Sequence, residues 1–325
     1  MGWISLDPDS LIFKCVHELL RHQTGRGGYN SDMNSFPMAL VLGSTFMHAG
    51  WNLIARRYKA EPGFFFGRML LVIVLVGLVP AALSEGLTHS LNLRAWLCVV
   101  GSGFCCGLYF FCLAQAYASS DFTTVYPVVR ALPVFLVGIG DVLRGRHPTE
   151  LGWIGMLLVI SGCFLAPLYS FRDFHVRSYF NRQILWMFLT ALGTVGYTLL
   201  DKVASETVLQ GPGTAARYGY VFFLVSYLAY GAFLRVFERG KKYSTTLGWG
   251  MTIFAACMNF GAYWLVLWAY QLSQHASYIV AFRQFSIVIG VILAFAIYKE
   301  KGLFVRLLGT FMITSGLLLI GLWGG

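Results

Sequence analysis

The chain has 325 residues, of which 57% are hydrophobic and only 12% are charged. An ordinary soluble domain carries roughly 25% charged residues, so this composition excludes a water-soluble globule of the usual kind. The formal net charge is +10 at pH 7. Almost all the basic residues lie in short gaps between apolar runs, where membrane proteins keep Lys and Arg. The positive charge therefore does not indicate a nucleic-acid partner.

The first segment, residues 1–35, is a polar N-terminal extension with one amphipathic patch at residues 11–20. The patch is too short and too charged for the core of a signal peptide. It fits a helix that lies in the membrane interface. The alternative is a misassigned start, because Met33 or Met38 would begin the protein directly at its first span.

Ten apolar runs follow, and each approaches the roughly 20 residues that a helix needs to cross a bilayer. Backbone polar groups in lipid must be satisfied within the segment, so these runs are predicted to be helices. We expect an all-α integral membrane protein of about ten transmembrane helices. The predicted spans are residues 36–54, 63–83, 95–116, 123–143, 153–169, 184–203, 218–236, 248–272, 276–298 and 303–322.

The spans divide into two related halves. A shift of 153 positions places Tyr117 on Tyr270 and Arg130 on Arg283. We predict a first five-helix repeat over residues 36–169, a connecting loop over 170–183 and a second repeat over 184–325. An odd number of spans per half gives the halves opposite orientations. Such inverted repeats place a solute site near the membrane midplane and suit alternating access.

The first span of each half carries a polar stripe on one face. A shift of 146 positions relates the two stripes, which are Ser44, His48 and Asn52 in the first half and Thr190, Thr194 and Thr198 in the second. A polar stripe on a spanning helix faces protein or a water-filled cavity, not lipid. We predict that both stripes line the solute site. His48 is also a candidate proton carrier if transport is coupled to protons.

Two motifs resemble a known family. The first span, ALVLGSTFMHAGWNLIARR at residues 39–57, is similar to the opening helix of the EamA branch of the drug/metabolite transporter superfamily. The ending, Lys299-Glu300-Lys301 followed by Gly309 and Gly316, is also similar, and the likeness extends over residues 35–325. Where that family has an acidic residue in the loop of the first half, this chain has Arg146. The resemblance implies transport of a metabolite without naming the cargo.

Arg130 and Arg283 are the predicted centre of the solute site. A mid-depth arginine costs at least about 2.5–3.5 kcal/mol, so something must compensate for it. Two guanidinium groups in a cavity bind a carboxylate, phosphate or phosphonate well, because they donate in pairs. The plastid sugar-phosphate exchangers of the same superfamily are similar in using cations there. The alternative is structural, with each arginine bonded to backbone carbonyls at a broken helix.

Other polar residues near the arginines complete the prediction. Tyr126, Tyr197 and Gln284 lie close to them on the helical pattern and are candidate binding residues. Asp141 and Asp201 lie near span ends and are interpreted as hydrated, with an ion-coupling carboxylate as the alternative for Asp201. The sequence contains no zinc-spaced Cys/His cluster and no phosphate-binding glycine loop, so we expect no metal and no cofactor.

These features favour a secondary transporter in a bacterial inner membrane that moves a small organic metabolite by alternating access. An anionic cargo, such as an amino acid, an organic phosphate or a phosphonate, follows from the paired arginines. A membrane enzyme acting on a lipid-borne substrate is the second hypothesis, and an assembly partner in a membrane complex is the third. The sequence does not indicate an oligomeric state.

Overall fold

The computed structural model describes residues 35–57, 62–119, 122–168, 170–173, 184–238, 248–298 and 303–324. The predicted interfacial patch at residues 11–20 lies outside the described residues, and so does most of the predicted connecting loop. The helices are α2 (Ser35–Arg57), α3 (Pro62–Thr88), α4 (Leu93–Ser119), α5 (Phe122–Leu143), α6 (Glu150–Leu165), α8 (Ile184–Ser205), α9 (Pro212–Phe237), α10 (Trp249–Leu272), α11 (Ala276–Arg283), α12 (Phe285–Tyr298) and α13 (Leu303–Trp323), with a short 3₁₀ turn, η1, at Phe171–Asp173.

The all-helical membrane architecture is confirmed. Within the described residues, 8 segments are long and apolar enough to cross a membrane. Two further predicted spans are also helical, since α6 is a shorter apolar helix of 16 residues and α5 runs for 22 residues. The division into two repeats stays a prediction.

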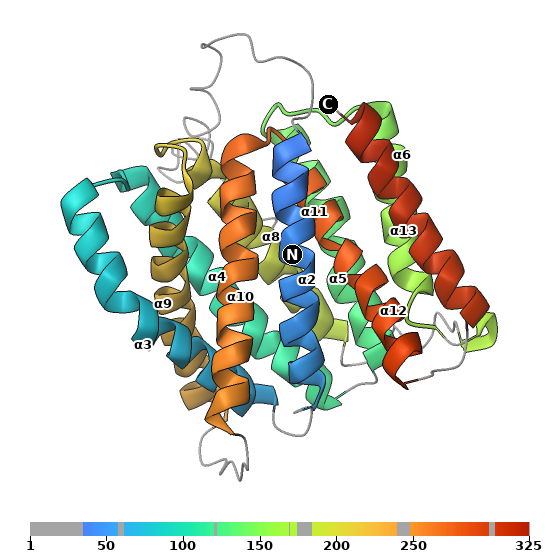
Figure 1. Ribbon diagram of the computed structural model, residues 1–325, viewed down its shortest axis with the longest axis horizontal. Helices are drawn as coiled ribbons and strands as arrows, with labels where there is room; N and C mark the ends of the chain where they lie inside the picture. The colour runs from blue at the N-terminus through green and yellow to red at the C-terminus, as the bar shows by residue number, and fades with distance from the viewer. Residues whose placement is uncertain are drawn as a thin grey trace, which may run out of the picture.

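The helices form one bundle in which segments distant in sequence lie side by side (Figure 1). Helix α2 packs along α10, and α4 packs against both α8 and α9. Helices α6 and α13 pair at one edge of the bundle, where they appear green and red. The predicted first and second halves are therefore interleaved rather than separate bodies.

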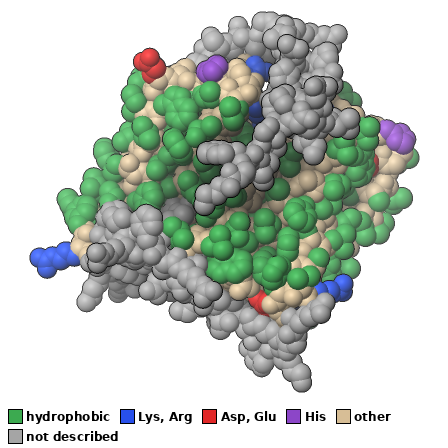
Figure 2. Space-filling model, turned by 180° about the vertical axis from the view of Figure 1, so that it is seen from behind, with side chains coloured by type: hydrophobic (Ala, Val, Ile, Leu, Met, Phe, Trp, Pro, Cys, Tyr) green, Lys and Arg blue, Asp and Glu red, His purple; other side chains and the backbone are tan. Residues whose placement is uncertain are grey.

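The outer surface has the polarity that a bilayer requires. Hydrophobic side chains cover much of the described part of the face in Figure 2, while the blue and red charged side chains lie mostly toward its margins. On α3, the large side chains of Leu75, Val76 and Val79 point outward and are more than half exposed. Lipid tails supply the apolar surroundings that these side chains lack within the chain.

Small residues let α6 and α13 approach closely. A methyl group added at Gly155 would lie 2.7 Å from the carbonyl oxygen of Gly316. The second contact is equivalent, because a methyl group at Gly162 would meet the carbonyl oxygen of Gly309 at 2.5 Å. Glycine at such positions allows the backbone contact that drives helix association in lipid.

The ninth predicted span, residues 276–298, is not one helix, and this corrects the sequence interpretation. It divides at Gln284 into α11 and α12. The amides of Gln284 and Ile287 bond to carbonyls three residues back, which is a tighter turn than an α-helix makes. The break leaves the carbonyl of Arg283 available to other donors, and it accepts from Ser286 Oγ at 2.9 Å.

Candidate functional site

A cavity lies at the centre of the bundle where α2, α4, α8, α9, α10 and α11 meet. Its walls are mostly aromatic, with a few polar groups among them. The lining residues are Ser44, Thr45, His48, Trp51, Cys106, Tyr109, Phe110, Tyr197, Phe222, Phe223, Asn259, Ala262, Tyr263, Val266 and Arg283. No carboxylate belongs to this described lining, whereas one arginine does.

Arg283 is the cation of the cavity. It is the last residue of the short helix α11, and its guanidinium lies 5.6 Å from the ring centre of Tyr263 on α10. Within the described residues, Arg283 makes no ion pair. A tyrosine face stabilises a cation through its ring quadrupole, but it does not neutralise the charge. The cavity therefore has a positive character.

Arg130 has a different environment. Its Nη2 donates to the backbone carbonyl of Arg283 at 3.2 Å and also to Ser286 Oγ. Its Nη1 lies 3.0 Å from Nε2 of His48. Arg130 is not among the cavity-lining residues. Its geometry agrees with the structural alternative, in which an arginine satisfies the carbonyls of a broken helix.

Helix α5 holds both ends of α11. Near the end of α5, the carboxylate of Asp141 accepts from the amides of Ala276 and Ser277 at 3.3 and 2.8 Å. Three turns earlier on α5, Arg130 bonds to the carbonyl at the other end of α11. An anion at a helix N-terminus and a cation at its C-terminus both stabilise the helix dipole. This arrangement fixes α11, and with it the position of Arg283.

The ring of His48 lies between two groups that can donate hydrogen bonds but cannot accept them. Trp51 Nε1 lies 3.1 Å from its Nδ1, while the Arg130 guanidinium faces its Nε2. A neutral imidazole has one acceptor nitrogen, and an imidazolium has none. Only one of the two contacts is therefore a hydrogen bond at a time, and an added proton would face a donor on each side. This geometry does not favour His48 as a proton carrier.

The remaining predicted residues divide into two groups. Ser44 and Tyr197 line the cavity, whereas Asn52, Thr190, Thr194, Thr198 and Gln284 do not. Several of the second group are engaged with their own helix: Asn52 donates to the carbonyl of His48, Thr190 to Trp186 and Gln284 to Val280. The side chain of Tyr126 lies outside the described part of the structure.

A comparison with known protein families gives the decisive observation. Residues 35–167 match the EamA-like transporter family. This part of the chain is similar to that family, which is part of the drug/metabolite transporter superfamily. The match confirms the resemblance drawn from the first span, and the apolar helices show a multi-pass membrane protein.

The whole fold of this EamA-like protein also has solved counterparts. One, described in the words "Crystal structure of protein", superposes with a TM-score of 0.66 at 14% sequence identity. The superposition covers 88% of this chain and 96% of the other. At that identity the likeness concerns the fold alone. A comparison with curated proteins found no match.

Asp201 lies at the centre of a buried polar cluster. This corrects the sequence interpretation, in which Asp201 was a hydrated residue near a span end. Far from being hydrated, it is 1% exposed. Its carboxylate accepts from Ser102 Oγ on α4, from the hydroxyl of Tyr218 on α9 at 2.7 Å and from the hydroxyl of Tyr263 on α10. Because the ring of Tyr263 also contacts Arg283, this carboxylate is linked to the cavity through one side chain. The signal available in the sequence was its place on the same helix as Tyr197.

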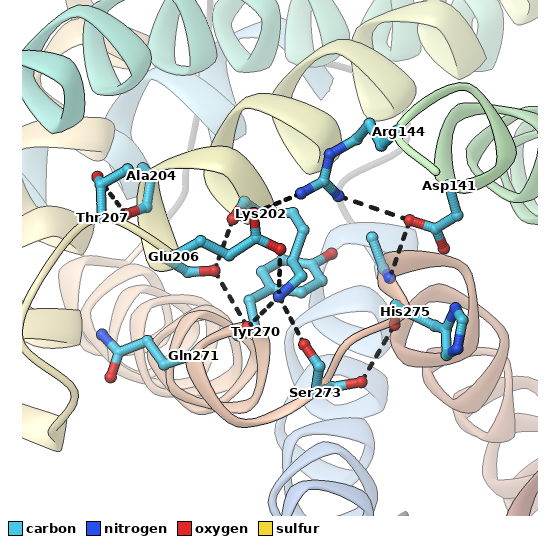
Figure 3. A network of polar contacts seen from close by, with 12 residues as sticks. Asp141, Arg144, Lys202, Ala204, Glu206, Thr207, Tyr270, Gln271, Ser273 and His275 are labelled. Atoms are coloured by element: carbon cyan, nitrogen blue, oxygen red, sulfur yellow. Dashed lines mark hydrogen bonds and ion pairs between the residues drawn. The ribbon is translucent and has the colours of Figure 1, made fainter. Parts of the chain in front are cut away.

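Asp141 was also predicted to be hydrated, but it is buried. It belongs to a second polar network (Figure 3). Arg144 Nη2 pairs with Glu206 at 2.7 Å, and Lys202 Nζ pairs with the same carboxylate at 3.1 Å. Lys202 also donates to the carbonyls of Tyr270 and Ser273 at 2.9 and 2.5 Å. These residues come from the ends of α5, α8 and α10, so the network closes one end of the bundle.

Proposed function

We propose that the protein is a secondary transporter that moves a small anionic organic metabolite across a bacterial inner membrane by alternating access. The observation that carries this proposal is Arg283, a cation in a central cavity with no ion pair among the described residues. A guanidinium without a counter-charge inside a membrane protein is unfavourable in free energy unless a ligand or water compensates for the lost solvation. An amino acid, an organic phosphate or a phosphonate supplies the oxygen pair that a guanidinium binds best.

The second support is the shape of the site. The lining comes from six helices, and α11 ends at the cavity where its chain breaks. Broken helices beside a central cavity are frequent in transporters, because they present polar backbone groups at membrane depth. The ion pairs of Glu206 with Arg144 and Lys202 join the ends of α5 and α8, and a contact of this kind supports a cavity that opens to one side of the membrane at a time.

The test is uptake by protein reconstituted in liposomes, with labelled carboxylates, phosphates and phosphonates. Arg283→Gln should abolish uptake of the anion that the wild-type protein moves, because it removes the cavity cation. Arg172→Gln removes a charge from the exposed turn η1 and should leave uptake unchanged. Equal uptake by Arg283→Gln and wild type for every anion would overturn the anionic cargo.

A membrane enzyme acting on a lipid-borne substrate is the alternative. It predicts a chemically altered product, whereas a transporter releases its solute unchanged. Mass spectrometry of the liposome lumen after uptake separates the two. The same uptake assay also tests for proton coupling. A proton gradient of either sign should change the uptake rate only if transport is coupled to protons.

A further inference from the structure

Asn259 stands out in the cavity because its amide donor is unused. The residue lies on α10 and is only 6% exposed. Its Nδ2 has no hydrogen-bond partner within the described part of the chain, and the residue lines the cavity. Leaving a buried donor without a partner costs about 1–3 kcal/mol. A polar group held at that cost beside a cavity is explained if a ligand supplies the missing acceptor.

Asn259 and Arg283 are related through Tyr263 on α10. Asn259 and Tyr263 are four residues apart on α10, so they share a face and are separated by about 6 Å along the axis. Tyr263 is the residue whose ring contacts the guanidinium of Arg283. The guanidinium therefore contacts the residue that lies one helical turn along α10 from Asn259, so both donors belong to the same side of the cavity.

Aromatic rings form much of the cavity wall around Tyr263. Phe222 stacks on Tyr263 with ring centres 4.7 Å apart, and Tyr197 meets Tyr263 edge-to-face at 5.7 Å. Tyr109 continues this wall, with its ring centre 5.9 Å from that of Tyr197. Such a wall favours a flat, unsaturated body, because aromatic pairs contribute about 0.5–1.5 kcal/mol beyond the area that they bury.

Two hydroxyl groups of the lining are already engaged as donors. Ser44 Oγ donates to the carbonyl of Val41 at 2.7 Å, and Thr45 Oγ1 donates to Leu42 at 2.6 Å. The cavity thus offers a charged donor, Arg283, and a neutral amide donor, Asn259. Its described lining contains no carboxylate for a cationic group.

From this arrangement we infer that Asn259 is a binding residue and that the solute is an aromatic acid with two polar ends. Its anionic head binds Arg283, its ring lies against the wall formed by Tyr109, Tyr197, Phe222 and Tyr263, and a neutral oxygen at its far end accepts from Asn259. The inference rests on the proposed function and narrows its anionic cargo to one chemical class.

The experiment measures binding of three probes to the purified protein in detergent, by the shift in its melting temperature over a concentration series. The probes are propanoate, 3-phenylpropanoate and 3-(4-hydroxyphenyl)propanoate, which share the head and add first the ring and then the far oxygen. Wild-type protein should bind them with rising affinity. The phenol should improve affinity by about two- to tenfold, the value of one neutral hydrogen bond.

Variants of Asn259 and Arg283 test the two binding residues separately. Asn259→Leu should lose the preference for the phenol while keeping its affinity for 3-phenylpropanoate, and Asn259→Ala serves if the leucine variant is unstable. Arg283→Gln should lose both aromatic acids. A phenol preference that persists in Asn259→Leu and Asn259→Ala would overturn the role of Asn259.

The outcomes also distinguish this inference from the proposed function. If neither aromatic acid stabilises the wild-type protein while another anion does, the aromatic class is wrong and anion transport stands. If no anion stabilises the protein, and Arg283→Gln changes nothing, the proposed function fails together with the inference.

Discussion

At residue scale, Asp201 shows how a buried carboxylate becomes part of the structure of the site. Three hydroxyl donors from three different helices converge on it. Each added donor favours the acceptor-only ionised form and holds its own helix in place. Through Tyr263, the cluster also fixes the ring that contacts Arg283. We interpret Asp201 as a positioning residue for the cavity wall.

Tyr218→Phe tests that interpretation, because it removes one donor, at 2.7 Å, and little volume. Interhelical hydrogen bonds in membranes contribute about 0.6 to 2 kcal/mol, so the melting temperature in detergent should fall by a few degrees. Tyr227→Phe on the same helix is the matched control, since no hydrogen bond of its hydroxyl occurs among the described residues. Equal losses in the two variants would contradict the assignment.

The sequence identified some residues of the site and not others, for a physical reason. Arg283, Ser44 and His48 were found because a charge or a polar stripe inside an apolar span is visible locally. Asn259 was overlooked, because an isolated amide in a span carries no pattern. The separate roles of Arg130 and Arg283 depend on contacts across 153 positions of sequence, which the matching positions of the two arginines do not reveal.

At element scale, the contact between α6 and α13 depends on glycine. Gly155→Ala would place a methyl group 2.7 Å from the carbonyl of Gly316 and 2.7 Å from Ile320, so one helix must move. We expect a lower melting temperature, although alanine is intrinsically better in a helix by about 1 kcal/mol. Gly231→Ala on α9 is the control, because nothing lies within 4 Å of the added group, and it should be neutral or stabilising.

An unchanged melting temperature for Gly155→Ala would show that the two helices do not depend on this close approach. The sequence shows glycines seven apart on both helices, a spacing typical of close helix contacts, but it does not show that these two helices are partners. The break between α11 and α12 was not predictable in the same way. Its residues include no proline or glycine, and the freed carbonyl of Arg283 is satisfied by Arg130 from α5.

At the scale of the whole molecule, an ion-pair network joins the ends of three helices on one side of the bundle. Arg144 follows α5, Lys202 and Glu206 belong to the end of α8, and Ser273 follows α10. His275 sits in the same connection, with its ring centre 4.6 Å from that of Tyr278. The order of helices in the sequence predicted a bundle with short connections. It did not predict which connections meet, because that depends on packing between distant helices.

The network makes one end of the protein sensitive to acid. Burial, together with the nearby charges of Lys202, Arg146 and Arg144, lowers the pKa of His275 from 6.5 to about 4. Between these values the unfolded chain binds more protons than the folded one, so the free energy of unfolding should fall as pH drops from about 6.5 toward 4.

Melting curves in detergent at several pH values check this expectation. His275→Gln removes the titrating group and should flatten the dependence, whereas His147→Gln, which alters an exposed histidine, should keep the wild-type slope. The carboxylates of Asp141 and Glu206 are present in all three proteins, so the difference between the curves reports on His275. If His275→Gln loses stability with acid as steeply as wild type, the acid sensitivity belongs to those carboxylates, and the neutral histidine does not help to hold this end closed.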